Sequence, residues 1–81
     1  MARVLMFGRL ADVAGWRERS LPETPATLSA LKALLSTENP ALGAALAGRG
    51  VQVAVGKAIV RGDVALSSGV EVAFLAPMSG G

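Results

Sequence analysis

Two β-prone runs stand near the start of the chain. Residues 3–10 are almost continuously apolar without clean alternation, which predicts a strand that is covered on both faces and lies centrally in a sheet. Residues 16–21 contain more polar side chains and predict an outer strand that ends at Pro22. Between them, residues 11–15 predict a single helical turn or a loop that Gly15 closes. The two strands are therefore expected to form a hairpin with a long loop.

A helix is predicted next, because leucines recur at helical spacing at Leu28, Leu31, Leu34 and Leu35. All four are expected in the core. Thr27 is a suitable N-cap, since its hydroxyl can accept a hydrogen bond from a free N–H of the first turn. Thr24-Pro25 is a competing start, because proline is tolerated in the first turn. Asn39-Pro40 is expected to end the helix.

The second half of the chain predicts a short helix and then strands. Residues 41–47 suit a second helix, which Gly48 and Gly50 are expected to close. β-Prone runs follow at residues 51–56, 58–60 and 70–75. Turns at 61–63 and 67–69 separate the later runs. The first turn reads Arg-Gly-Asp, an adhesion motif in some proteins, but glycine and aspartate favour turns for backbone reasons.

This order of elements predicts an α+β domain. Strands flanking one main helix indicate a mixed sheet of about five strands with that helix on one face, and with a short second helix beside it. If the first and last strands pair in the middle of the sheet, they are parallel, as in the β-grasp or ubiquitin-like fold. The predicted β-grasp domain spans residues 1–75, and residues 76–81 are expected to form a flexible tail.

Composition narrows the function. The chain has 81 residues, no cysteine and no histidine, so a cysteine nucleophile and the commonest general base are excluded. The six acidic residues are scattered without metal-ligand spacing. The formal net charge of +2 is dispersed, and few aromatic residues are available to stack bases, so no nucleic-acid partner is expected. Neither a membrane span nor a secretory signal is recognisable, which predicts a cytoplasmic protein.

The sequence ends in Gly80-Gly81 after Ser79, and this ending suggests a chemistry. Two residues without side chains can thread a narrow channel. A terminal carboxylate at Gly81 could attack the α-phosphorus of ATP, and a sulfur or nitrogen nucleophile could then capture the acyl-adenylate. The alternative from the residues alone is an inert terminal segment.

Segments 4–15, 53–56 and 69–81 together resemble the MoaD-like small subunits of molybdopterin synthase. The most specific part is the final segment, which reads GVEVAFLAPMSGG. Departures from the usual family pattern occur at Gly56, Ser68, Val70, Leu75 and Ala76. The loss of acidic residues beside Gly69 puts in doubt any partner contact that depends on acidity there.

The resemblance implies a sulfur carrier with no cofactor of its own. An adenylating enzyme of the MoeB-like kind would use ATP to activate Gly81, and a sulfur donor would convert it to a thiocarboxylate. The tail would then enter a MoaE-like large subunit and donate sulfur to a pterin precursor. The catalytic side chains would belong to these partners, so the chain would be a non-catalytic subunit of a sulfurtransferase.

Docking to such partners requires a surface near the tail. We predict that it is hydrophobic and drawn from Phe7, Ile59, Leu75 and Met78, with Pro77 directing the exit. Because side chains alternate along a strand, at most one of Phe74 and Leu75 should be core.

Two other functions share the tail chemistry. One is a sulfur carrier for thiamine synthesis or transfer-RNA thiolation. The other is a ubiquitin-like modifier whose Gly81 forms amide bonds with lysines of target proteins.

Overall fold

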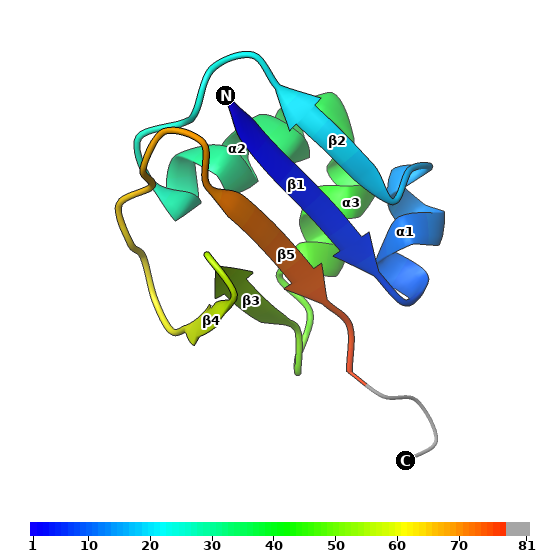
Figure 1. Cartoon of the computed structure of the whole chain (residues 1–81). Coiled ribbons are helices and arrows are strands. Elements are labelled where there is room, and N and C mark those ends of the chain that lie inside the picture. Colours follow the sequence, from blue (N-terminus) through cyan, green and yellow to red (C-terminus); the bar gives the residue numbers. More distant parts are fainter. Residues whose placement is uncertain (78–81) are drawn as a thin grey trace.

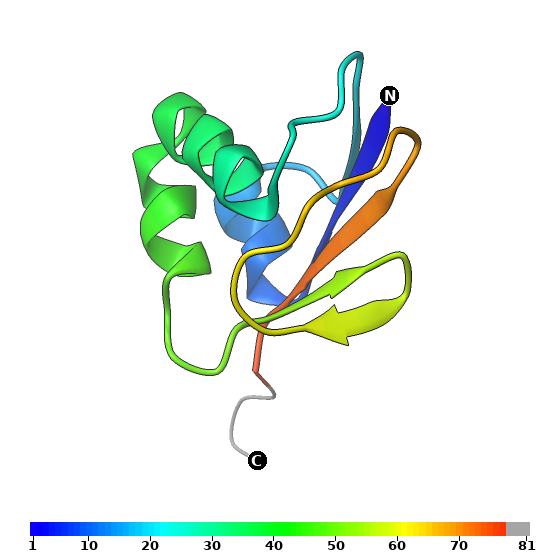
Figure 2. The ribbon, with the colours of Figure 1, turned by 90° about the vertical axis from the view of Figure 1, so that its left-hand side faces the viewer.

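The computed structural model describes residues 1–77, which form one five-stranded sheet with three helices on one side (Figures 1 and 2). The elements are β1 (Ala2–Phe7), α1 (Arg9–Ala14), β2 (Glu18–Leu21), α2 (Leu28–Glu38), α3 (Pro40–Leu46), β3 (Gln52–Val55), β4 (Ala58–Val60) and β5 (Glu71–Leu75). The strand order is β2-β1-β5-β3-β4. The first and last strands pair in parallel and all other neighbours are antiparallel. The predicted β-grasp architecture is confirmed.

The N-terminal run divides earlier than predicted. β1 ends at Phe7, and Gly8 has a φ of 64° that turns the chain into α1. The helix therefore includes Arg9 and Leu10, which the prediction assigned to the strand. Gly15 closes it as expected, in the left-handed conformation with φ 84°, and donates its N–H to the carbonyl oxygen of Ala11 over 2.9 Å.

The prediction that β1 is covered on both faces is wrong. Ala2, Val4 and Met6 are buried, whereas Phe7 on the opposite face is 46% exposed. The helices form a single layer, so only one face of the sheet is covered (Figure 2). Apolar residues on the uncovered face make the strand read like one that is buried on both sides.

The first of the two predicted starts of the main helix is confirmed, because Thr27 is the N-cap of α2. The Thr27 hydroxyl oxygen accepts a hydrogen bond from the Ala30 N–H over 3.1 Å. Asn39 ends α2 and also caps α3, because its side-chain oxygen accepts from the Leu42 N–H over 3.1 Å. α3 ends at Leu46 with Ala47 as its C-cap, and the Gly48 N–H donates to the Ala45 carbonyl oxygen over 3.0 Å, so Gly48 closes the helix as predicted whereas Gly50 lies in the following loop.

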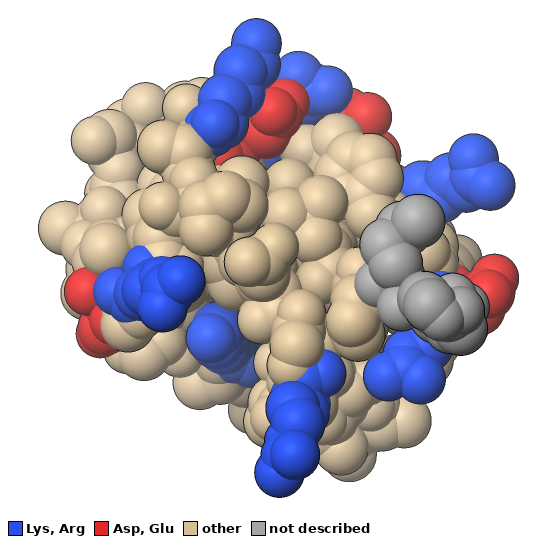
Figure 3. All heavy atoms as spheres, turned by 90° about the horizontal axis from the view of Figure 1, so that it is seen from below, with Lys and Arg blue, Asp and Glu red and all other residues tan. Residues whose placement is uncertain are grey.

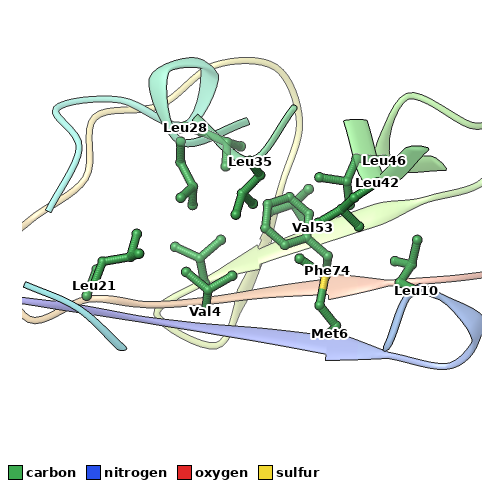
Figure 4. Close-up of a cluster of buried hydrophobic side chains, with 13 residues drawn as sticks. Val4, Met6, Leu10, Leu21, Leu28, Leu35, Leu42, Leu46, Val53 and Phe74 are labelled. Carbon is green, nitrogen blue, oxygen red and sulfur yellow. The ribbon is translucent and has the colours of Figure 1, made fainter. Parts of the chain in front are cut away.

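The core lies between the sheet and the helices (Figure 4). Phe74 on β5 is fully buried and projects towards the leucines of α2 and α3. The leucine stripe of α2 is core at three of its four positions, Leu28, Leu31 and Leu35, but Leu34 is 38% exposed. No polar or charged side chain is buried within residues 1–77. Apolar packing therefore holds the two layers together.

The Arg-Gly-Asp tripeptide is a structural turn. Gly62 has a φ of 76°, and both carboxylate oxygens of Asp63 accept hydrogen bonds from Ser29, one from its N–H and one from its hydroxyl, each over 2.8 Å. These bonds from the first turn of α2 lower the pKa of Asp63. The turn thus anchors the start of the main helix to the loop after β4.

We predict that Leu31→Ala lowers the free energy of unfolding by about 2–5 kcal/mol, because truncating a buried leucine removes apolar burial and leaves a cavity. Leu34→Ala in the same helix should change it by less than about 1 kcal/mol, since Leu34 is partly exposed. Urea unfolding monitored by circular dichroism measures both. Equal losses for the two variants would contradict the assignment of Leu34 to the surface.

We also predict that Asp63 stabilises the fold in a pH-dependent way. Its pKa in the folded protein lies below the ordinary value of 3.8, so the contribution is complete above that value and is lost as pH falls through the depressed pKa. Urea midpoints for wild type and Asp63→Asn should therefore differ at pH 7 and converge at the acid end. Glu23→Gln is the control, because Glu23 forms no ion pair or side-chain hydrogen bond within residues 1–77.

Candidate functional site

The C-terminal segment leaves from the middle strand of the sheet. Leu75, the last residue of β5, lies between Phe7 of β1 and Gln52 of β3 in the strand register. Beyond it, Ala76 is partly buried and packs against the core, and Pro77 is exposed. Figure 1 shows the segment departing from the lower end of the sheet. Residues 76–77 therefore leave the sheet at the end of its central strand.

Two glycine turns contact this exit. A Cβ atom added to Gly8 would lie 3.2 Å from the Cβ of Ala76, and one added to Gly50 would lie 3.1 Å from the Cβ of Pro77. Both glycines have positive φ, 64° and 84° respectively, which disfavours a side chain at either position. The turn after β1 and the loop before β3 therefore approach the base of the tail more closely than other residues would allow.

The sequence analysis missed this role for Gly8 and assigned Gly50 to a helix end. A glycine directly after a strand is a signal for a positive φ. However, the contacts with Ala76 and Pro77 join residues far apart in the sequence, so no local pattern reveals them.

The uncovered face of the sheet is apolar next to the exit. Cross-strand partners share a face of the sheet, and Phe7 pairs with Leu75. A second row of partners runs across four strands through Leu5, Ala73, Ala54 and Ile59. Alternation along each strand places both rows opposite the buried face that holds Val4 and Phe74.

The predicted docking residues within residues 1–77 share this surface. Phe7 is 46% exposed, Ile59 is 52% exposed, and Leu75 is partly buried. Phe7 and Leu75 are direct neighbours, whereas Ile59 lies on the edge strand, three strand spacings or about 14 Å from β1. The alternation argument is confirmed, because Phe74 is core and Leu75 is not. Met78, Ser79, Gly80 and Gly81 lie outside the described residues.

The far end of the same face is charged. Arg3 bonds the carboxylate of Glu18 over 2.8 Å and lies 3.5 Å from that of Glu71. Arg3 and Glu71 pair at the end of β1 away from the tail, whereas Glu18 pairs with Leu5 in the middle of the strand, and all three side chains are at least partly exposed. The uncovered face is therefore polar at one end and apolar beside the exit.

An ion pair with shifted pKa values lies on the helical side of the sheet. Arg19 donates two hydrogen bonds to Glu38 at the end of α2 and lowers the pKa of that carboxyl group. Within residues 1–77, no cluster of three or more potential ligands is arranged to hold a metal ion. Nor does that part of the chain contain a helix long and apolar enough to cross a membrane.

A sequence model of the ThiS family matches residues 4–81. The chain belongs to the ThiS family. The predicted resemblance to MoaD-like proteins is thereby confirmed at the level of the ThiS/MoaD-like β-grasp domain. No curated protein sequence matches the chain significantly.

Solved structures agree with this ThiS-family assignment. The crystal structure of SAMP1 from Haloferax volcanii superposes with a TM-score of 0.84 at 26% identity, covering 99% of this chain and 98% of that one. The solution structure of the small archaeal modifier protein SAMP1 from Methanosarcina acetivorans gives 0.80 at 22% identity, with 99% and 95% covered. A putative molybdopterin converting factor subunit 1 from Pyrococcus furiosus gives 0.76 at 23% identity, with 95% and 97% covered.

These neighbours include both a modifier and a molybdopterin factor subunit. This ThiS-family chain therefore has the fold shared by sulfur carriers and ubiquitin-like modifiers. In that fold the exit of the tail, the two glycine turns and the apolar part of the uncovered face form one continuous region, which is the candidate functional site.

Proposed function

We propose that this protein is a sulfur carrier that acts as the small subunit of molybdopterin synthase. The observation that supports the proposal most strongly is that the family match extends through Gly81, so it includes the Gly-Gly ending as well as the folded domain. The similarity to a putative molybdopterin converting factor subunit favours this pathway. It also favours a large synthase subunit as a partner.

The proposed chemistry takes place on the carboxylate of Gly81. Its oxygen attacks the α-phosphorus of ATP on an adenylating enzyme, and pyrophosphate leaves. A sulfur nucleophile from a donor then displaces AMP and produces a thiocarboxylate. In the large subunit, the thiocarboxylate sulfur bonds to the pterin precursor, and water then hydrolyses the bond between that sulfur and the Gly81 acyl carbon, which leaves the sulfur on the precursor and regenerates the carboxylate. The chain has no cysteine or histidine, so the proposal assigns acid-base catalysis to the partners.

The geometry of the exit suits delivery into a partner. Four residues follow Pro77, and a fully extended chain spans at most about 3.3–3.6 Å per residue, so Gly81 can reach about 14 Å beyond it. Gly80 and Gly81 offer no side chain to a narrow channel. Because Ala76 packs against the core, the first residue of the tail is held by the folded domain.

The free energy of binding must also offset the conformational entropy that the tail loses when it becomes ordered in the partner. Fixing a backbone costs about 1–2 kcal/mol per residue, and glycine loses more freedom than other residues. The apolar part of the uncovered face can supply that free energy by burial. We therefore propose that Phe7, Leu75 and Ile59 contact the partner, together with Met78 and with Pro77 at the exit.

A second candidate function is a ubiquitin-like protein modifier. The specific observation in its favour is the similarity to one SAMP1 crystal structure, whose TM-score of 0.84 and identity of 26% exceed the 0.76 and 23% of the putative molybdopterin converting factor subunit. Intact mass spectrometry after activation distinguishes the two. A thiocarboxylate adds about 16 Da as sulfur replaces oxygen, whereas conjugation to a target protein gives much heavier adducts. A sulfur carrier for another pathway would give the same mass but no molybdopterin.

Deleting Gly81 should abolish sulfur transfer and leave the melting temperature unchanged, because the residue lies beyond the folded core. The assay is reconstitution with purified adenylating enzyme, large subunit, ATP, a sulfur donor and the pterin precursor. Lys57→Ala, an exposed substitution at the opposite end of the sheet, should retain full activity. Formation of molybdopterin by the chain that lacks Gly81 would contradict the sulfur-carrier mechanism.

Phe7→Ala should weaken binding to the large subunit by about five- to thirtyfold, as expected for an aromatic anchor at the centre of an interface. Leu34→Ala is the matched control, because Leu34 is similarly exposed but lies on the helical side. Calorimetric titration with each folded variant measures the affinities. An unchanged affinity for Phe7→Ala would contradict docking through the uncovered face. Met78→Ala tests the tail side of the same surface.

A further inference from the structure

Two arginines stand beside the glycines that contact the tail. Arg9 follows Gly8, which touches Ala76, and Arg49 precedes Gly50, which touches Pro77. Both arginines are exposed, and neither forms an ion pair within residues 1–77. The two positively charged side chains therefore arise from separate elements that both border the exit, Arg9 from the first residue of α1 and Arg49 from the loop before β3.

Two more arginines, Arg17 and Arg61, lie on either side of the exit and add to its positive charge. The carbonyl oxygen of Arg17 accepts a hydrogen bond from the Met6 N–H over 2.8 Å, so Arg17 lies beside the end of β1. Arg61 directly follows β4, and it lines a shallow hollow together with Gly50 and Gln52. Figure 3, which views the molecule from the tail end, shows Lys and Arg side chains projecting on several sides of this face.

Few acidic groups offset these charges at the exit. Asp12 and Glu18 line the same hollow as Arg17, and Glu18 is engaged by Arg3. Glu38 and Asp63 are occupied by Arg19 and Ser29. Asp12 has no ion-pair partner within residues 1–77 and offsets one unit of the positive charge of Arg9, Arg17, Arg49 and Arg61, so a net positive charge remains beside the tail.

We propose that Arg9 and Arg49 form a basic collar around the tail exit, and that this collar binds an acidic rim at the entrance of the site that receives the tail in a partner protein. The inference rests on the proposed function, because it assumes that the tail enters a partner. A guanidinium group presents a planar set of donors that matches a carboxylate in a bidentate arrangement. Two such groups from separate elements would fix how the tail is oriented as it enters.

Other anionic partners fit the collar less well. When the tail is fully extended into a partner, Gly81 lies about 14 Å beyond Pro77, so a phosphate joined to Gly81 would then be beyond the reach of an arginine side chain at the exit. Nucleic-acid grooves combine positive charge with several stacking aromatic side chains. Within residues 1–77, Phe7 is the one aromatic residue among the exposed large apolar side chains.

The test is charge reversal with a matched control. The double variant Arg9→Glu, Arg49→Glu changes the formal net charge from +2 to −2, because each substitution removes two positive units. The control combines Lys57→Glu with Ser67→Glu and with Ser20→Glu, at the position that pairs with Arg3, and it also removes four units in total. Its positions lie at the opposite end of the sheet, since the Gly56 N–H bonds Glu71 and the Gly69 N–H bonds Met1.

Stopped-flow and calorimetric binding to the purified adenylating enzyme, and separately to the large subunit, provide the readout. At about 50 mM salt, the association rate constant and the affinity of the reversed variant for one or both partners should each fall at least tenfold. Both values for the control should stay within about twofold of wild type. At about 0.5 M salt the difference should shrink, because exposed charges are screened. Arg9→Lys, Arg49→Lys keeps the charge but loses the bidentate geometry, so its affinity should lie between those of wild type and the reversed variant.

Unchanged binding of the reversed variant to both partners would overturn the collar, as would an equal loss in the control. Retained protein binding combined with lost anisotropy of a labelled single-stranded RNA would also overturn it, in favour of a nucleic-acid site. Wild-type sulfur transfer with no effect of reversal on binding rejects the collar but leaves the proposed function intact. Salt-dependent, collar-dependent binding without any sulfur transfer supports the collar and rejects the sulfur-carrier function.

Discussion

The parallel ladder between β1 and β5 joins the first and last strands of the domain, and the functional region depends on it. Its register places Val4 beside Val72 and Met6 beside Phe74 on the buried face. The same register places Phe7 beside Leu75 on the uncovered face. One set of main-chain hydrogen bonds therefore aligns the core, the apolar docking surface and the point from which the tail departs.

The single layer of helices has a cost and a use. In a small domain, covering only one face of the sheet limits the apolar area that folding can bury. It also leaves a flat surface beside the tail, where Phe7 and Ile59 remain exposed. Residues that a two-sided core would enclose are instead available to a partner, and burial on binding can then offset the ordering of the tail.

The exit shows how backbone conformation and charge occupy the same small region. Gly8 and Gly50 have positive φ and allow two loops to approach Ala76 and Pro77. Each glycine has an arginine beside it in the sequence, Arg9 at the start of α1 and Arg49 in the loop before β3. The apolar surface is suited to affinity, whereas the exposed charges are suited to steering and orientation.

The sequence by itself determined the elements and their order, because these depend on local physics. Strand-forming runs, the Thr27 cap, the left-handed Gly15 and the Gly-Gly ending are all recognisable within a few residues, and the family resemblance rests on similar short segments. Alternation along the strand also predicted that Phe74 and Leu75 lie on opposite faces.

Only the tertiary structure decided which apolar faces are covered. Hydrophobic periodicity shows that a face is apolar, but it does not show what lies against that face. This is why the sequence predicted that β1 is buried on both sides and that Leu34 is in the core. The glycine contacts at the exit also required the folded chain, because strand register brings Gly8 and Gly50 to a segment many residues away.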